Sequence, residues 1–110
     1  QADILTMALI VVLVNLGVHY RSDLEAVEQV TLDVARQVLK ETPGGVPSFE
    51  PVLRYGAFGG SGIDLTVVLR AKDCSSGPLL KHAFIKKLHR RYIQEGITIP
   101  YPTQVVIQEK

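Results

Sequence analysis

Hydrophobic residues form a nearly unbroken run near the start of the chain, over residues 4–16, interrupted only by Thr6 and Asn15. Within this run, residues 8–14 are rich in Ile, Val and Leu and show no alternation with polar residues. This pattern predicts a strand that is buried on both faces or central in a sheet, and a buried helix is the competing interpretation that periodicity alone leaves open.

A helix is predicted over residues 22–40, where apolar residues recur at intervals of three and four. The stripe consists of Leu24, Val27, Thr31, Val34 and Val38, widened by Val30, Ala35 and Leu39. Ser22 and Glu25 have the spacing of a capping box, in which the Ser22 hydroxyl accepts from the Glu25 amide. Pro43 and the two glycines after it are expected to stop the helix.

Two strands are predicted next, over residues 49–58 and 63–72. The second alternates apolar and polar residues with a period of two, as expected of a sheet with one face on a core. The segment between them, residues 59–62 (Gly-Gly-Ser-Gly), is typical of a hairpin turn. A phosphate-binding loop is the less fitting interpretation, because such loops lead from a strand into a helix.

A second helix is predicted from Ser76, which is followed by Gly and Pro, to Gly96. Its apolar stripe is Phe84, Leu88 and Tyr92, flanked by Leu80 and Ile85. A final strand is predicted over residues 97–107. Residues 1–7 are expected to be a disordered end or a foreign remnant, and residues 8–110 a single domain.

The predicted order is strand, helix, strand, strand, helix, strand, which is the split βαβ pattern. The sequence therefore predicts an α+β, ferredoxin-like βαββαβ sandwich, with two helices on one face of a four-stranded antiparallel sheet. In that fold the second and fourth strands are edges, and proline is tolerated mainly at edges and strand starts. Pro51, Pro100 and Pro102 fall in the predicted second and fourth strands, and the other two strands have none.

Composition limits the remaining possibilities. The chain has 110 residues, which suits one domain, and 12 Lys and Arg against 11 Asp and Glu give a net charge of +1. Cys74 is the one cysteine, so neither an intrachain disulfide nor a multi-cysteine metal site is expected. The first apolar run falls short of the roughly 20 residues of a membrane-spanning helix. Because the chain begins with Gln1, we expect a processed chain or a piece of a larger one.

The strongest local charge feature lies on the predicted second helix. On a helical wheel His82, Lys86, His89 and Arg90 share one side, roughly opposite Leu80, Phe84 and Arg91, and Lys87 belongs to the same basic cluster. One interpretation is a solvated helix face. The other is an electrostatic or interface face that meets a partner's acidic surface or influences passing ions.

Other chemistry has weaker signals. His82 and His89 are two helical turns apart, about 10 Å, which is too far for one metal ion. Cys74 has no neighbour in the sequence that suggests an activated thiolate. RNA-recognition motifs stack bases on aromatics of the central strands, and residues 9–14 and 63–69 contain none. We therefore expect no catalytic residue, no metal, no cofactor and no nucleic-acid partner.

Three stretches of the chain, taken together, resemble one known family. Residues 17–27 (GVHYRSDLEAV) contain a Tyr-x-Ser-Asp turn between an apolar run and a helix, residues 58–65 (FGGSGIDL) a hairpin, and residues 96–102 (GITIPYP) a Gly-Ile-x-Ile-Pro-aromatic-Pro segment. In order and spacing they resemble the C-terminal α/β domain of small-conductance mechanosensitive channels. The resemblance runs from about residue 9 to residue 107.

The resemblance implies a ferredoxin-like domain on the cytoplasmic side of the cell membrane, assembled as a heptamer whose copies form a vestibule below the pore. Such channels open under membrane tension and release ions and solutes during osmotic downshock. The transmembrane helices and the middle β-domain of such a channel are absent from these 110 residues. The role implied is structural, without catalysis, and the isolated domain is expected to be soluble and at most weakly oligomeric.

A second hypothesis is a freestanding ferredoxin-like regulatory module that binds a small ligand or a partner protein. The reading frame around the sequence discriminates the two. Upstream apolar segments of roughly 20 residues favour the channel, and a start codon just before Gln1 favours the module.

Overall fold

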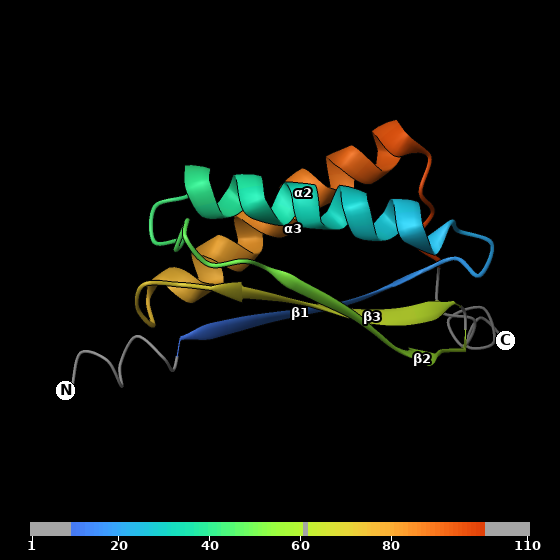
Figure 1. Cartoon of the computed structure of the whole chain (residues 1–110), viewed down its shortest axis with the longest axis horizontal. Coiled ribbons are helices and arrows are strands. Elements are labelled where there is room, and N and C mark those ends of the chain that lie inside the picture. The colour runs from blue at the N-terminus through green and yellow to red at the C-terminus, as the bar shows by residue number, and fades with distance from the viewer. Residues whose placement is uncertain (1–9, 61, 101–110) are drawn as a thin grey trace, which may run out of the picture.

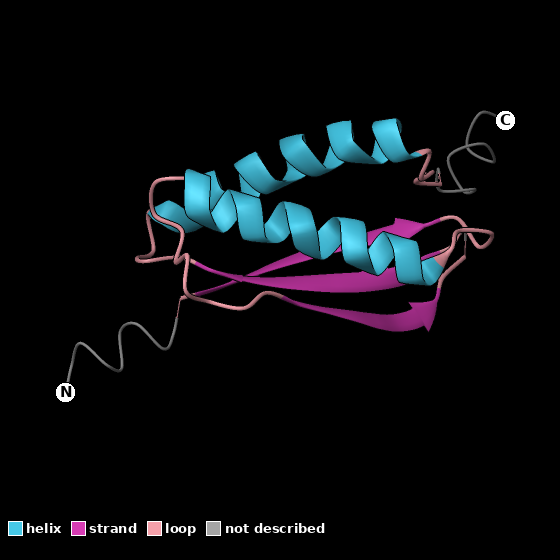
Figure 2. Ribbon diagram, turned by 45° about the horizontal axis from the view of Figure 1, so that its top comes forward, coloured by secondary structure: helices cyan, strands magenta, loops and turns pink. Residues whose placement is uncertain are grey.

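A computed structural model of the chain describes residues 10–60 and 62–100. In chain order these residues form β1 (Val11–Val18), α2 (Leu24–Glu41), β2 (Val52–Phe58), β3 (Ile63–Arg70) and α3 (Ser76–Glu95). The strands form one antiparallel sheet in the order β1-β3-β2. Both helices lie on the same side of that sheet (Figures 1 and 2). The chain is a small α+β fold in which two helices cover one face of a three-stranded sheet.

The first strand has one buried face and one exposed face, so the prediction of burial on both faces is wrong. Val12, Val14 and Val18 are buried, whereas Val11 and Leu13 are 50% and 52% exposed. The physical reason is that both helices pack on one side of the sheet, so nothing among the described residues covers the other. The element is a strand, which decides against the buried-helix interpretation, and it begins at Val11.

The second and third strands form the predicted hairpin with shorter bounds. Phe49 donates its amide to the carbonyl of Val46 in a turn, and Pro51 has no amide to give to a ladder, so β2 begins only at Val52. In β3 the predicted alternation is confirmed, with Ile63, Leu65, Val67 and Leu69 buried. β3 is the central strand and β2 an edge strand, as the positions of the prolines indicated. β1, which the same reasoning places in the centre, is an edge strand of the described sheet.

The predicted fourth strand is not formed where the structure describes it. Residues 97–100 carry no strand assignment, and the rest of the predicted strand, residues 101–107, lies outside the described residues. One backbone hydrogen bond, from the His19 amide to the Thr98 carbonyl at 3.0 Å, joins this segment to the end of β1. The prediction of four strands is therefore wrong for the described part of the chain, whose sheet has three. The predictions for residues 1–7 also lie outside the described residues.

Helix α2 begins two residues later than predicted because Asp23, not Ser22, caps it. The Asp23 carboxylate accepts hydrogen bonds from the amides of Glu25 at 3.1 Å and Ala26 at 3.3 Å. The Ser22 amide is used in the preceding turn, where it donates to the His19 carbonyl. The predicted capping box is thus wrong, since a charged acceptor one residue later satisfies the free amides of the first turn.

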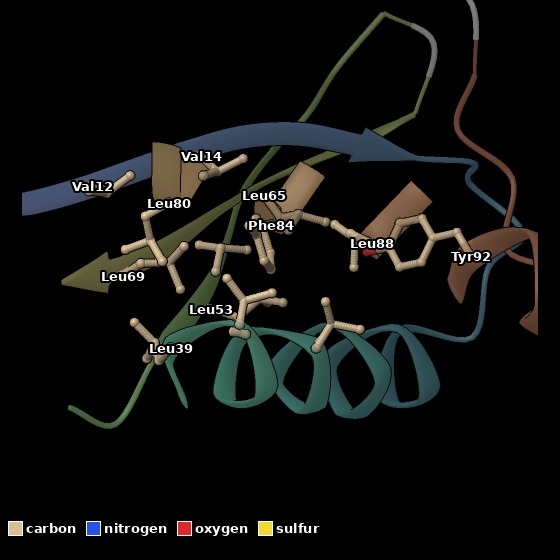
Figure 3. Close-up of a cluster of buried hydrophobic side chains, with 14 of the residues drawn as sticks. Val12, Val14, Leu39, Leu53, Leu65, Leu69, Leu80, Phe84, Leu88 and Tyr92 are labelled. Carbon is tan, nitrogen blue, oxygen red and sulfur yellow. The ribbon is translucent and has the colours of Figure 1, made fainter. Parts of the chain in front are cut away.

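The core lies between the sheet and the two helices (Figure 3). From α3 it contains Leu80, Phe84, Leu88 and Tyr92, all at most 4% exposed, which confirms the predicted stripe. Ile85, predicted to flank that stripe, is 48% exposed. From α2 it contains Val27, Thr31, Val34, Ala35, Val38 and Leu39. The hydroxyls of Thr31 and Tyr92 are hydrogen-bonded to each other, so these two buried polar groups satisfy one another.

Candidate functional site

The basic residues of α3 are positioned by the opposite, buried side of the same helix. Because Phe84 and Leu88 face the core, the positions between them turn outward. His82, Lys86 and Arg90 are all exposed and recur every four residues, so they lie one above another on a single helix face. The C-terminal end of α2 lies beside this face. The exposed face of α3 is therefore one wall of a groove whose other wall is α2.

A hollow of about 310 Å³ separates the two helices at this point. It is lined by Val38, Glu41, Thr42, His82, Ala83, Lys86, Lys87 and Arg90. A second hollow of about 230 Å³ adjoins it and is lined by Val34, Gln37, Lys87, Arg90, Arg91 and Gln94. Lys87 and Arg90 line both, so the two hollows are parts of one feature, which we name the basic groove.

The structure brings together four of the five predicted site residues, namely His82, Lys86, Lys87 and Arg90. His89 lies apart from them and lines a different hollow, which is bounded by Tyr92, Ile93, Ile97, Ile99 and Pro100. The helical wheel grouped His89 with the others because it treats α3 as an isolated cylinder. The position of α2 decides which part of the exposed face becomes a groove.

The charges in the basic groove are only partly compensated. Lys87 Nζ lies 3.3 Å from Glu41 Oε1, and Arg91 pairs with Asp33 at 2.9 Å and with Glu95 at 3.0 Å. Hydrogen bonds from Arg91 to Asp33 and then Glu95 raise the pKa of its guanidinium. Lys86 and Arg90 form no ion pair within the described ranges.

Sequence reasoning missed the part of the groove that α2 contributes. Gln37, Glu41 and Thr42 lie 40 or more positions before the cations that they face. No spacing rule links such positions, because which turn of α2 faces α3 is decided by packing on the sheet. The helical wheel placed Arg91 on the side of α3 opposite the basic residues. In the structure Arg91 lines the second hollow together with Lys87 and Arg90.

The turn before α3 accounts for the neighbourhood of Cys74. The Asp73 carboxylate accepts hydrogen bonds from the Ser76 amide, the Ser76 hydroxyl and the Ser75 hydroxyl, at 2.8 to 2.9 Å. These hydrogen bonds, those from Ser76 first, lower the pKa of Asp73. The carboxylate thus holds the start of α3, and Cys74 beside it is a free, exposed cysteine. Among residues 10–60 and 62–100 there is also no cluster of three or more metal-ligating side chains.

A second notable place lies at one end of the sheet, where β1 ends. The Tyr20 hydroxyl donates to the Gly59 carbonyl, and the His19 amide donates to the Thr98 carbonyl. Gly62 is buried here. A Cβ atom on it would collide with the carbonyl oxygen of Val18 and lie 2.9 Å from Cγ of Pro100. We name this contact region, formed by residues 18–20, 59, 62 and 98–100, the sheet corner.

No protein-family model matches the chain, and no curated protein matches it either. Neither described helix combines the length and the apolar character needed to cross a lipid bilayer.

Proposed function

We propose that the chain is the cytoplasmic α+β domain of a small-conductance mechanosensitive channel. In this role the domain packs against copies of itself, as a heptamer in the parent channel, and against the other domains of the parent chain. It forms part of a charged wall through which ions and solutes pass during osmotic downshock. It performs no catalysis, takes no cofactor, and meets the membrane only through transmembrane helices elsewhere in the parent.

The observation that carries the proposal is the sheet corner. The three stretches that resemble the channel family are about 30 residues apart along the chain, yet they meet there. Tyr20 of the first is hydrogen-bonded to Gly59 of the second, and His19 is hydrogen-bonded to Thr98 of the third. The fold brings the end of β1, the β2–β3 turn and the end of α3 to the same end of the sheet, so this contact supports the architecture that the resemblance implies. Residues that form one contact region are expected to be kept together when a fold is inherited.

The arrangement of the sheet supports the finer fold that the proposal requires. A ferredoxin-like βαββαβ sandwich has its first and third strands in the centre, with the fourth strand beside the first. The order β1-β3-β2 leaves the outer edge of β1 for that fourth strand. In the described residues, the segment after α3 reaches the end of β1 through the hydrogen bond from the His19 amide to the Thr98 carbonyl.

The test is electrophysiology on the parent protein. The reading frame that contains this sequence is expressed, reconstituted into liposomes and examined by patch clamp under graded suction. We expect currents that appear only under membrane tension. A frame without apolar segments of roughly 20 residues, or a parent that gives no tension-activated current, would contradict the proposal.

The contribution of the basic face is tested in the same preparation. Lys86→Glu together with Arg90→Glu is expected to shift ion preference or lower conductance at low salt, because reversed charge changes the local potential near passing ions. Lys81→Glu is the matched control, since Lys81 is an exposed cation of α3 outside the basic groove. Unchanged permeation in the double variant would mean that these cations are simply the solvated face of α3 and have no role in ion passage.

The basic groove favours one other candidate, a freestanding regulatory module that binds a small ligand. A hollow of about 310 Å³ is at the lower end of the size of small-molecule sites. A start codon directly before Gln1, with no apolar segments upstream in the same frame, would favour this candidate over the channel.

A further inference from the structure

Two cations in the basic groove have no charge partner in the described part of the chain, and this placement works against folding. Lys86 and Arg90 are four residues apart on one face of α3, about 6 Å along the helix axis. Like charges at this spacing repel each other and destabilise a helix slightly. Both residues are exposed, so neither is required by the core. The pair is therefore expected to cost a little stability, and neither side chain belongs to the buried core.

The groove has the form of a small binding site. Its floor is apolar, with Val34, Val38 and Ala83, and polar groups stand around it, among them Thr42, Gln37 and Gln94. Arg90 borders both hollows. Its guanidinium is suited to two parallel hydrogen bonds to one oxyanion. His82, Lys86 and Lys87 line the first hollow with it, so four nitrogen-bearing side chains border the same space.

Carboxylates flank the positive region, and this limits the size of the occupant. Glu41 pairs with Lys87 beside the first hollow, and Asp33 and Glu95 pair with Arg91 beside the second. The uncompensated charge therefore spans only about one helical turn. An extended polyanion such as a nucleic-acid backbone would continue past Lys86 and Arg90 onto these carboxylates and be repelled by them.

We infer that the basic groove binds a small anion carrying two or more negative charges, held by Arg90 and Lys86 with His82 beside them. Phosphate groups and clustered carboxylates share this chemistry. The inference goes beyond the channel proposal, because it concerns the domain alone and holds for either candidate function.

The inference is tested by nuclear magnetic resonance on the 110-residue chain, titrated with sodium pyrophosphate at constant ionic strength. We expect saturable shifts of the amide signals of Thr42, His82 and Ala83, which line the first hollow. Lys86→Gln with Arg90→Gln is expected to raise the dissociation constant at least about tenfold, since two charge-assisted contacts are lost. Lys81→Gln, which removes an exposed cation outside the groove, is expected to leave the constant within about twofold.

A variant that binds the anion more tightly distinguishes a true binding site from an effect of general disturbance of the structure. Glu41→Gln frees Lys87 from its ion pair and removes the one carboxylate that lines the first hollow. It is expected to tighten pyrophosphate binding about threefold, because one repelling charge is removed and one cation is released. A variant that merely disturbed the helices would weaken binding instead.

A parallel titration with citrate, which carries carboxylates and no phosphate, distinguishes a phosphate ligand from a carboxylate ligand. Pyrophosphate binding at least about tenfold tighter than citrate would assign the site to phosphate compounds, and equal binding would support recognition of polyvalent anions as a class. Shifts that never saturate, or an equal loss of binding in Lys81→Gln and in the double variant, would overturn the inference. Because the assay contains no membrane and no parent channel, its failure leaves the channel proposal standing, and the reverse also holds.

Discussion

The sheet corner and the basic groove differ in what holds their residues in place. At the corner, backbone atoms approach so closely that Gly62 has no room for a side chain, and Tyr20 is tied to Gly59 by a hydrogen bond. In the groove, Lys86 and Arg90 are exposed and make no ion pair with any described residue. The corner is specified by packing, whereas nothing in the packing requires the cations of the groove.

Because of this difference, residues of the corner bear on the fold, whereas the cations of the groove bear on function. Residues at the corner are needed for the fold itself, so a resemblance carried by them speaks first of common architecture. The exposed cations Lys86 and Arg90 of the groove lie outside the core, so we expect their replacement to leave the fold intact. Fold and function are therefore read from different regions of this molecule, and each can be tested by substitutions that leave the other intact.

The largest effect is expected at the corner, from Gly62→Ala. The added methyl would overlap the Val18 carbonyl oxygen, which is backbone and cannot turn aside. We expect the free energy of unfolding to fall by about 3 kcal/mol, the upper end of the usual cost of overpacking. Gly60→Ala is the matched control, since a Cβ there meets nothing within 4 Å, and it is expected to change stability by less than about 0.5 kcal/mol. Equal values in urea denaturation would refute the tight contact.

A smaller effect is expected from Tyr20→Phe. The substitution keeps the ring and removes only the hydroxyl that donates to Gly59, so a loss of about 1 kcal/mol is expected, the net worth of one hydrogen bond. Chemical denaturation of the two proteins side by side measures it. A variant as stable as the parent would mean that water replaces this bond without cost.

Alkaline pH tests the same end of the molecule through Tyr55. Its hydroxyl donates to the Leu24 carbonyl at 2.7 Å, where α2 begins. Burial, helped by the negative charge of Glu28, raises the pKa of Tyr55 from 10.0 to about 12. Because the folded pKa is the higher one, the stability contributed by neutral Tyr55 is fully present below pH 10 and is lost as pH rises toward 12.

The measurement is the free energy of unfolding between about pH 9 and pH 11.5 for the parent and for Tyr55→Phe. The parent is expected to lose stability more steeply above about pH 10 than the variant, because only the parent has this proton to lose. Parallel curves would show that the pKa of Tyr55 is the same in the folded and unfolded chains.

The smallest effect on stability is expected in the groove. Lys86→Gln with Arg90→Gln should leave the free energy of unfolding within about 0.5 kcal/mol of the parent or raise it slightly, because exposed like charges are removed. Thermal unfolding at low salt measures it. A loss above about 1 kcal/mol would mean that these side chains take part in packing, and the contrast between groove and corner would fail.

Several elements were predictable because their signals are local. The helical period of α3 is enough to place Phe84, Leu88 and Tyr92 on one face, and that face is the one the core buries. The alternation of apolar and polar residues correctly predicted that β3 has one buried face. The glycine-rich segment between β2 and β3 predicted their hairpin. The cap of α2 was predicted wrongly, because Ser22 and Glu25 have the spacing of a capping box whereas the Asp23 carboxylate accepts the amides of the first turn.

The candidate site was predictable only on the side that one helix contributes. The cations of α3 are close in sequence, so a helical wheel brought His82, Lys86 and Arg90 together, and Lys87 was assigned to the same basic cluster. It also included His89, which lines another hollow, and it could not supply Glu41 or Gln37. The partners across a groove belong to another element, and their positions depend on how two helices settle on a sheet.

The order and type of the described elements follow from the amino-acid sequence, because hydrophobic period, caps and turn residues act over a few positions along the chain. The sequence also predicted, correctly, that β3 is central and β2 an edge, but β1, predicted to be central as well, is the other edge of the described sheet. Three features depend instead on the folded arrangement: the exposed face of β1, the lack of room at Gly62, and the groove that Lys86 and Arg90 share with α2. These features arise from contacts between segments far apart in the chain, and such contacts are set by the packing of all elements at once rather than by the pattern of any one.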